Sequence, residues 1–552
     1  MQLRPFRLTY PYAFAASALI VGGAPPASIT GCAAPVANAP PIASPSANWP
    51  RASVLAPAET AAAPIPSASG ATSSPSASTG AVPSASANPP SVAPAAPSAP
   101  PRAWKGGEFQ RALAALASWV KKNHGELSAE LDDVESGVLL GSVSANALEN
   151  PASNEKLLTT AAVLRHLGQA RRFKTTLNGA RAGDTVAALV IRGSGDPSFS
   201  SDDLLALAKA LSHSGITHVG DILVDQSFFD GHFVPPAFEQ EPHEWAAFRA
   251  PVSAVSLNRN VTTLNVAPGE IGQNARVWFD PEGFVDVTGS VRTEKLDRAE
   301  NVKLTLKESG VRLEATVAGA IDAKSAPFRW SRRVEDPMLL AGYGLKAALG
   351  AAGIQVSGKI APGGQGEQNE LAVHESKPLG ELLPELGKDS DNFYAETLLK
   401  DLGAEVKGTP GTSENGASVV LDYLREIEAL DAGTRITNGS GLFDANRISA
   451  HTLVKTLRAA YREPATSSVF VEQLAVGGVD GTLKHRFGAF KKQRTIHAKT
   501  GTLDRAIALS GYVFRPDGSY PVAFSLIVNG IANHAELRKR IDEVVVSVAR
   551  GL

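Results

Sequence analysis

Three short polar clusters follow one another along this chain of 552 residues, and each carries side chains that could act in acyl transfer. In chain order the clusters are Ser153-Asn154-Glu155-Lys156, Ser390-Asp391-Asn392 and Lys499-Thr500-Gly501. A serine hydroxyl is a poor nucleophile at neutral pH and needs a neighbouring base. Together, the clusters predict a serine nucleophile with a nearby base, and with proton-transfer and substrate-binding groups from remote parts of the chain.

The first cluster fits a nucleophile with its base one helical turn away. Ser153 and Lys156 are three residues apart, which places them on the same face of a helix. We expect this helix over residues 153–166, after Pro151 and before Gly168. Ser153 at its N-terminus would also aim the positive end of the helix dipole at a developing oxyanion. Taken alone, the cluster is more typical of a serine N-cap followed by a solvated lysine.

The second and third clusters supply groups for proton transfer and substrate binding. Ser390 could relay a proton to a leaving amine while the amide of Asn392 holds a peptide, although this cluster alone is typical of a helix cap. Lys499 supplies positive charge, and Thr500 can bind a terminal carboxylate. On an edge strand, Gly501 would leave room for a peptide to pair with the backbone. The alternative for this third cluster is an ordinary strand end with a turn.

The elements that must position these clusters are predicted by hydrophobic periodicity at both ends of the folded part. Before the first cluster we expect an amphipathic helix at 106–122 and short strands at 128–131 and 137–140 around the Asp132-Asp133 turn. Around and after the third cluster we expect antiparallel strands at 495–500, 506–514 and 521–529, a turn at 516–518, and a closing helix at 534–550. With a mostly helical stretch at about 375–475, this pattern indicates one discontinuous α+β domain.

The long span between the first two clusters indicates an insertion. Much of it has the alternation of β-strands, for example at 185–192, 261–266, 275–279 and 302–317, with a helix at 201–214. We therefore expect an inserted domain, or two, over residues 176–375, mostly β. The domain that carries the clusters would then consist of residues 103–175 and 376–552.

The N-terminal part has the pattern of an exported lipoprotein. Arg4 and Arg7 precede an apolar run at 13–24 that is too short to span a bilayer, which is typical of a signal peptide. The run leads to Ile29-Thr30-Gly31-Cys32, which resembles the bacterial lipobox. We expect a signal peptide at 1–31, a lipid on Cys32, and a disordered Ala/Pro/Ser-rich linker at 32–102. The alternative is an ordinary signal peptide that happens to contain a cysteine.

Composition narrows the function classes further. The chain has a single cysteine, so an internal disulfide or a cysteine-rich metal site is excluded. Its formal net charge is −2, and no segment beyond the N-terminus is notably basic, which argues against a nucleic-acid partner.

Further stretches, in the same order, match one family. The chain resembles the D-alanyl-D-alanine carboxypeptidase/endopeptidases among the low-molecular-mass class C penicillin-binding proteins, over about residues 126–532. Besides the three clusters, the matching stretches are Gly195-Asp196-Pro197, Ala250-Pro251-Val252-Ser253-Ala254, Leu257-Asn258-Arg259-Asn260, Phe393-Tyr394-Ala395-Glu396, Gly439-Ser440-Gly441-Leu442, Gly478-Val479-Asp480-Gly481-Thr482-Leu483 and Thr502-Leu503. The resemblance implies a penicillin-binding-protein/β-lactamase-like transpeptidase fold with a large insertion between the first two catalytic motifs.

The resemblance also implies catalytic roles. Ser153 would attack the D-Ala-D-Ala peptide bond of peptidoglycan stem peptides, Lys156 would act as its base, and Ser390 would shuttle the proton. The acyl-enzyme would then be hydrolysed, and β-lactams would acylate the same serine as inhibitors. The family uses no metal or organic cofactor, so none is expected. The enzyme would work on the periplasmic side of the cell envelope, held by its lipid in a membrane, the outer membrane being favoured.

Substrate binding is implied for the remaining positions. Asn392, Lys499, Thr500 and Gly501 would hold the peptide, and the backbone N–H groups of Thr502 and of the nucleophile would hold the oxyanion.

Departures from the family pattern concern substrate preference. Asn438 stands where the family usually has Asp, and Asp444 where a basic residue is common. An acid typical of the stretch before Ala250 falls near His243 and Glu244. These positions lie in the region that the family uses to bind the charged diamino-acid end of the stem peptide. Two other functions stay open: a β-lactamase, and a catalytically silent cell-wall-binding lipoprotein with the same fold.

Overall fold

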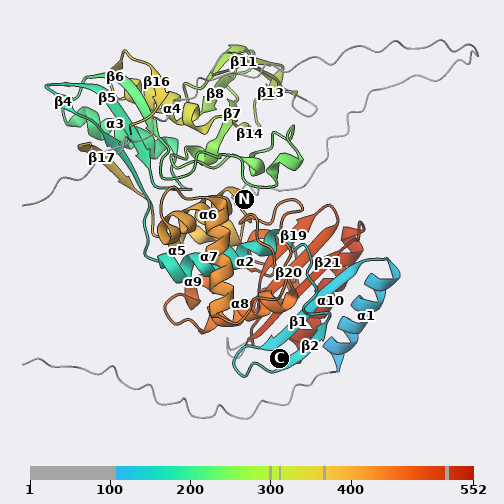
Figure 1. Cartoon of the computed structure of the whole chain (residues 1–552). Helices are drawn as coiled ribbons and strands as arrows, with labels where there is room; N and C mark the ends of the chain where they lie inside the picture. Colours follow the sequence, from blue (N-terminus) through green and yellow to red (C-terminus); the bar gives the residue numbers. More distant parts are fainter. Residues whose placement is uncertain (1–106, 297–300, 310–311, 365–367, 516–520) are drawn as a thin grey trace, which may run out of the picture. The chain divides into compact units, whose positions relative to one another are not determined.

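The computed structural model describes residues 107–552, apart from 297–300, 310–311, 365–367 and 516–520 (Figure 1). The expected signal peptide, the lipidation site Cys32, the linker at 32–102 and the turn at 516–518 lie outside the described residues. Within the described part of the chain, no helix combines the length and the apolar character needed to cross a bilayer.

One antiparallel sheet joins the two ends of the described chain. Its strand order is β18-β19-β20-β21-β1-β2. The strands are β1 (Glu126–Asp133), β2 (Leu139–Val143), β18 (Ala475–Val476), β19 (Ile496–Leu503), β20 (Ala506–Val513) and β21 (Val522–Asn529). Because β1 pairs with β21 along its whole length, from Glu126 opposite Asn529 to Asp133 opposite Val522, the first and last parts of the fold form a single structural unit.

The prediction of a turn at Asp132-Asp133 was wrong, because β1 continues through both residues in its pairing with β21. Both aspartates belong to β1, and the chain turns at residues 134–138 instead. There the Asp133 carboxylate accepts hydrogen bonds from the backbone N–H and the hydroxyl of Ser136, at 2.7 and 2.6 Å. An aspartate that bonds to groups a few residues later is a common way to close a turn. The two acids therefore mark the start of the turn rather than its centre.

Each face of the sheet is covered by helices. On one face α1 (Glu108–Lys122) packs against α10 (His534–Gly551), and both helices bury apolar stripes that confirm the predicted periodicity. The buried side chains are Phe109, Leu113, Leu116 and Val120 of α1, and Leu537, Ile541, Val544, Val545 and Val548 of α10. Alternate residues of the strands, such as Leu509 and Ala508 in β20, belong to separate apolar clusters on the two faces.

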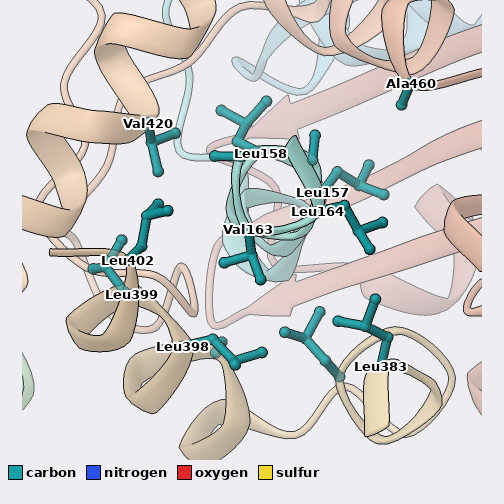
Figure 2. Close-up of a cluster of buried hydrophobic side chains, with 14 of the residues drawn as sticks. Leu157, Leu158, Val163, Leu164, Leu383, Leu398, Leu399, Leu402, Val420 and Ala460 are labelled. Atoms are coloured by element: carbon teal, nitrogen blue, oxygen red, sulfur yellow. The ribbon is translucent and has the colours of Figure 1, made fainter. Parts of the chain in front are cut away.

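The other face carries the helical region, with α2 (Glu155–Leu167) at its centre. Around it lie α5 (Leu379–Gly387), α6 (Asn392–Lys407), α7 (Ser413–Glu426), α8 (Ala450–Arg462) and α9 (Ser467–Glu472). Figure 2 shows Leu158, Val163 and other α2 side chains pointing in different directions, among the leucines of the surrounding helices. Every residue from Glu155 to Leu164 is buried, so α2 is a central helix rather than an amphipathic one.

The start of this helix also differs from the expectation. Ala152–Asn154 forms a single 3₁₀ turn, η1, and the α-helix begins at Glu155. Such a tighter first turn is common at helix N-termini. Ser153 thus lies in the turn that leads into α2, and the helix ends, as expected, at Gly168 with positive φ.

Residues 174–375 form two further apolar cores. The first belongs to a seven-stranded sheet of order β15-β6-β5-β3-β17, in which β16 also pairs with β6 and β4 with β5. Its elements are β3 (Lys174–Asn178), β4 (Arg181–Ala182), β5 (Thr185–Gly193), α3 (Ser201–His213), β6 (His218–Asp225), α4 (Pro337–Ala351), β15 (Gln355–Val356), β16 (Ile360–Pro362) and β17 (Glu370–Glu375). Lys174 pairs with Glu375, so the chain enters and leaves this region at one point.

The second core belongs to short strands between β6 and α4. They are β7 (Val261–Ala267), β8 (Arg276–Asp280), β9 (Val285–Gly289), β10 (Arg292–Glu294), β11 (Lys303–Ser309), β12 (Arg312–Ala318), β13 (Ala320–Asp322) and β14 (Phe328–Arg333). The expected β stretch at 302–317 is a hairpin, in which β11 pairs antiparallel with β12.

Candidate active site

The first predicted pair lies in contact at the start of α2. The Nζ of Lys156 is 3.1 Å from the Oγ of Ser153. The same nitrogen is 2.7 Å from the side-chain oxygen Oδ1 of Asn392 and 2.8 Å from the backbone carbonyl of Ser440. These last two oxygens can only accept hydrogen bonds. An uncharged amine would keep its two N–H bonds on them, and its lone pair would then face the serine hydroxyl.

The charge state of Lys156 suits a base. The side chain is fully buried, and burial lowers the pKa of its amine to about 7, against the opposing effect of the carboxylates of Glu396, Asp391 and Glu155. A substantial fraction of Lys156 is therefore uncharged at neutral pH. An ordinary exposed lysine would be almost entirely protonated there.

The turn that carries the nucleophile is held from both sides. Ala152, just before Ser153, has a positive φ of 46°, and its N–H donates to Oδ1 of Asn150 at 3.0 Å. Asn150 in turn exchanges two hydrogen bonds with Asn529 at the end of β21. The nucleophile turn is thus tied to the central sheet.

The second and third clusters meet each other. The Nζ of Lys499, on β19, donates to the Oγ of Ser390 at 2.7 Å and to the carbonyl of Thr500 at 2.8 Å. Lys499 is fully buried, and burial together with the charge of Lys156 holds its pKa well below the usual value. Asn392, which belongs to the same cluster as Ser390, contacts Lys156 of the first cluster. The structure therefore brings residues of all three clusters into one network.

Gly501 lies against the nucleophile turn. A Cβ atom there would lie 2.8 Å from the carbonyl oxygen of Pro151 and 3.1 Å from the Cβ of Ala152. The missing side chain therefore lets β19 pack against the nucleophile turn, and that space is not available to a substrate. A peptide could still pair with the free edge of β19, since β18 pairs only with His497 and Ala498.

The hydroxyl groups of the two threonines of β19 do not take part in the hydrogen bonds between Ser153, Lys156, Ser390 and Lys499 that the structure describes. The hydroxyl oxygen of Thr502 accepts a weak hydrogen bond from Arg538 of α10 at 3.4 Å, and Arg538 forms no ion pair with any residue that the structure describes. Thr500 is partly exposed, and its carbonyl receives Lys499. Neither contact tests the binding roles expected for these residues.

Sequence reasoning assigned no role to Ser440 or Glu396. The buried carboxylate of Glu396 accepts the backbone N–H groups of Ser440 at 2.8 Å and Gly439 at 3.2 Å. It thereby fixes the loop whose Ser440 carbonyl holds Lys156. Glu396 lies four residues after Asn392 and so on the same face of α6, and it belongs to a stretch that matches the family pattern, although that match assigned it no role.

Comparison with known proteins identifies the family. A model of the D-Ala-D-Ala carboxypeptidase 3 (S13) family matches residues 112–550. The chain belongs to this family. Its members include serine peptidases of the penicillin-binding class, so the protein is a serine peptidase, as the sequence predicted.

Individual relatives agree with this assignment. The D-alanyl-D-alanine carboxypeptidase of Actinomadura sp. (strain R39) is 33% identical over 422 residues, covering 72% of this chain and 76% of the relative. The D-alanyl-D-alanine carboxypeptidase DacB of Haemophilus influenzae is 26% identical over 397 residues, 69% of this chain and 80% of the relative.

The solved structure of penicillin-binding protein 4 (dacB) from Haemophilus influenzae is similar in fold. Its TM-score is 0.64 at 22% identity, and the match covers 79% of this chain and 99% of that one. The same protein has also been solved in complex with a novel β-lactam. The predicted α+β penicillin-binding-protein fold is confirmed.

Two of the residues that depart from the family pattern, Asn438 and Asp444, have different surroundings in the structure. Asn438 is buried, and its side chain bonds to the Pro236 and Leu442 carbonyls and to the Gly441 N–H, so it holds the loop together. Asp444 is largely exposed, pairs with Arg447 at 2.6 Å, and accepts a weak hydrogen bond from Asn150. Its carboxylate thus contacts Asn150, which precedes the nucleophile Ser153 by three positions in the sequence.

The other departure lies in the segment before Ala250. Glu244 contributes mainly its backbone, because its carbonyl accepts Nη1 of Arg249 and Nε of Arg333, each at 2.9 Å. Its carboxylate accepts only the N–H of Ala246, at 3.0 Å, among the contacts of the described chain. His243 is exposed.

Glu155, inside the first cluster, is a buried acid that the sequence did not mark. It is completely buried, and neither carboxyl oxygen has a hydrogen-bond partner among the residues that the structure describes. Burial and the nearby Glu396 hold its pKa well above the usual value. The folded state therefore favours the protonated, uncharged form of this side chain.

This protonation makes a testable contribution to stability. A carboxyl group whose pKa is raised on folding binds its proton more tightly in the folded state than in the unfolded chain. The free energy of unfolding therefore falls as the pH rises above 4.5, the pKa of this group in the unfolded chain. Glu155→Gln should remove this loss. Its free energy of unfolding relative to wild type should rise with pH by up to about 1.4 kcal/mol per pH unit.

Urea unfolding at pH 5, 6.5 and 8 would measure this difference, with the exposed Glu381→Gln as control. A Glu155→Gln difference that stays the same at all three pH values would show that Glu155 is ionised in the folded protein.

Proposed function

We propose that the protein is a D-Ala-D-Ala carboxypeptidase and endopeptidase that cleaves peptidoglycan stem peptides through an acyl-enzyme on Ser153. The observation that carries the proposal is the contact between Ser153 and a buried Lys156 whose other two partners can only accept hydrogen bonds. Membership of the family and the names of its relatives support the substrate class.

The first half-reaction follows from this geometry. Uncharged Lys156 takes the proton from Ser153 as its oxygen attacks the carbonyl carbon of the penultimate D-alanine. The backbone N–H groups of Ser153 and Thr502 stabilise the oxyanion. Ser390, beside Lys499, relays the proton now on Lys156 to the departing nitrogen, so that Lys156 is uncharged again. The C–N bond breaks, the terminal D-alanine leaves as an amine, and an ester remains on Ser153.

The second half-reaction uses the same groups. Water replaces the departed amine, gives up a proton toward Lys156, and attacks the ester. The shortened peptide leaves with a new carboxylate, and Ser153 recovers its proton. β-Lactams, whose ring amide mimics the scissile bond, acylate the same oxygen.

Substrate binding is proposed along the free edge of β19. The peptide backbone pairs with this edge, Asn392 and Lys499 contact it, and Thr500 holds the terminal carboxylate. A bound carboxylate would also favour the charged form of Lys499. The negative charge of Asp444 near the nucleophile turn supports a stem-peptide preference that differs from that of relatives with a basic residue there.

The decisive experiment uses a synthetic stem pentapeptide that ends in D-Ala-D-Ala. The wild type should release free D-alanine and Ser153→Ala should release none, as measured by mass spectrometry. Cross-linked muropeptides, digested in parallel, would report endopeptidase activity. Penicillin labelling without peptide cleavage would support the silent binding protein, and rapid penicillin turnover would support a β-lactamase.

We also propose a domain arrangement. Residues 103–175 and 376–552 form the peptidase domain, and residues 176–375 form the insertion. The pairing of β3 with β17 close to both boundaries, and an apolar core built entirely from residues between them, support this division.

For localisation, we propose that residues 1–31 direct export and that a lipid on Cys32 anchors the enzyme. Residues 32–102 would act as a tether, and the enzyme would face the periplasm, the outer membrane being favoured. The sequence Ile29-Thr30-Gly31-Cys32 after an apolar run supports the anchor. Cys32→Ser should move the protein from the membrane to the soluble fraction of cells without loss of penicillin binding. Unchanged membrane association would contradict the anchor.

A further inference from the structure

A strained turn connects the inserted region to the active site. Asn258, Arg259 and Asn260 are consecutive residues other than glycine, with φ values of 50°, 58° and 53°. Side chains with a Cβ atom rarely adopt this left-handed conformation, and a run of three is rarer still. Such backbone persists only where the surrounding structure holds it, and it is concentrated at functional sites.

Both asparagines hold this turn through their side chains. Asn258 donates to Asp280 at 2.9 Å and accepts the N–H of Ser201 at 2.9 Å. Asn260 is fully buried and donates to the Pro251 carbonyl at 2.9 Å. The turn is thus held on both sides of Arg259, whose own side chain is left to extend away from it.

The Arg259 side chain ends on the second catalytic cluster. Its Nη1 lies 2.7 Å from Oδ2 of Asp391, and its Nη2 lies 2.9 Å from Oε2 of Glu385. The guanidinium also lies 5.0 Å from the ring centre of Tyr394. Asp391 stands between Ser390 and Asn392, and its other oxygen caps α6 by accepting the N–H of Tyr394.

A second contact comes from the same region of the chain. The side-chain nitrogen of Asn392 donates to the carbonyl of Phe248 at 3.1 Å. This bond orients the amide so that its oxygen faces Lys156. The two contacts fix Asp391 and Asn392, and Ser390 precedes them directly in the chain.

We propose that Arg259 is a positioning residue, through which the inserted region holds Ser390 and Asn392 in their catalytic geometry and offsets the charge of Asp391 beside the base. This inference rests on the proposed function and adds to it: the insertion completes the active site rather than merely interrupting the domain.

The effect of Arg259 on the pKa of Lys156 follows from the charged groups around both side chains. Lys156 faces Glu155 on its own helix, Glu396 and Asp391 on α6, and Lys499 on β19. Arg259 faces Asp391, Glu385 on α5 and the nearby Asp389. Without the guanidinium, the full charge of Asp391 would act on Lys156 and favour its protonated form. The pKa of Lys156 would then rise.

The test measures the rate constant for acylation by a fluorescent penicillin from pH 5.5 to 9 on the full-length protein. Arg259→Gln should lower this constant at pH 7 roughly tenfold or more, which corresponds to the loss of a charge-assisted hydrogen bond. It should also shift the acidic limb of the profile to higher pH. Arg259→Lys, which keeps the charge, should leave the limb in place and retain part of the rate. Arg165→Gln, which removes an exposed ion pair with Glu426, is the matched control and should change neither.

A second variant keeps the proposal testable if Arg259→Gln does not fold. Asp391→Asn preserves a good helix cap but removes the charge, so its acidic limb should move to lower pH. An Arg259→Gln protein with a lower melting temperature but the wild-type acylation profile would overturn the proposal, as would an Asp391→Asn limb that does not move. Failure of the wild type to bind penicillin or to release D-alanine would refute the proposed function instead.

Discussion

Replacing Lys156 by methionine is expected to slow the acylation of Ser153 by roughly 10²- to 10⁴-fold, the usual contribution of a general base. Methionine fills the same buried space without an amine, so the nucleophile loses the one basic group in contact with its hydroxyl among the described residues. Stopped-flow measurement of penicillin acylation at pH 7.5 would give the rate constants.

A matched control separates this effect from the loss of a buried lysine. Lys400 is only 2% exposed, and its amine pairs with Asp230 at 2.6 Å, away from Ser153. Lys400→Met should reduce stability but leave acylation within a few-fold of wild type. Similar rate losses in both variants would remove Lys156 from the role of base.

The pH dependence of acylation in the wild type should report the titration of Lys156. Because Lys156 must lose its proton to accept one, the acylation rate should rise with pH through an acidic limb at about pH 7, where burial places its pKa. In Lys156→Met this limb should disappear, since the residual reaction no longer depends on that proton.

Replacing Ser390 by alanine should have the second-largest effect, and it should depend on the leaving group. An amine leaves only when protonated, and the Ser390 hydroxyl, 2.7 Å from Lys499, is the proposed donor. We expect the cleavage of a D-Ala-D-Ala peptide to slow by roughly 10²-fold or more, within the range for acid–base groups. The matching D-Ala-D-lactate ester should lose far less, because its leaving alkoxide depends less on a donor in contact with it.

Steady-state hydrolysis of the peptide and of the ester by the same preparations would measure the difference. Equal losses for both substrates would mean that Ser390 acts before the leaving group departs. The folded state of Ser390→Ala, checked by its melting temperature, separates a local effect from loss of structure.

Much of the site followed from local patterns in the sequence. A serine and a lysine three residues apart before an apolar run predicted the contact of Ser153 with Lys156, because residues at this spacing share a helix face. The apolar periodicity of residues 106–122 and 534–550 likewise predicted α1 and α10. Periodicity did not reveal that α2 is buried on all sides, because Glu155 and Thr159 look like solvent-facing positions in the sequence.

The remaining features depend on contacts between distant residues. The contact of Arg259 with Asp391 spans 132 positions, and its turn lacks the glycine that normally signals a left-handed backbone. The bonds from Glu396 to the loop at Ser440 and the packing of Gly501 on Pro151 also need the folded chain. In each case the contact joins residues that are far apart in the sequence, and local patterns do not specify it.

The central claim is that Ser153 is the residue acylated. Protein treated with penicillin and digested with protease should yield one modified peptide, and fragmentation should place the added mass on Ser153. The Ser153→Ala variant should remain unmodified while keeping the wild-type melting temperature within a few degrees. An adduct on Ser390, on Ser440 or on any other residue, or persistent labelling of Ser153→Ala, would contradict the account.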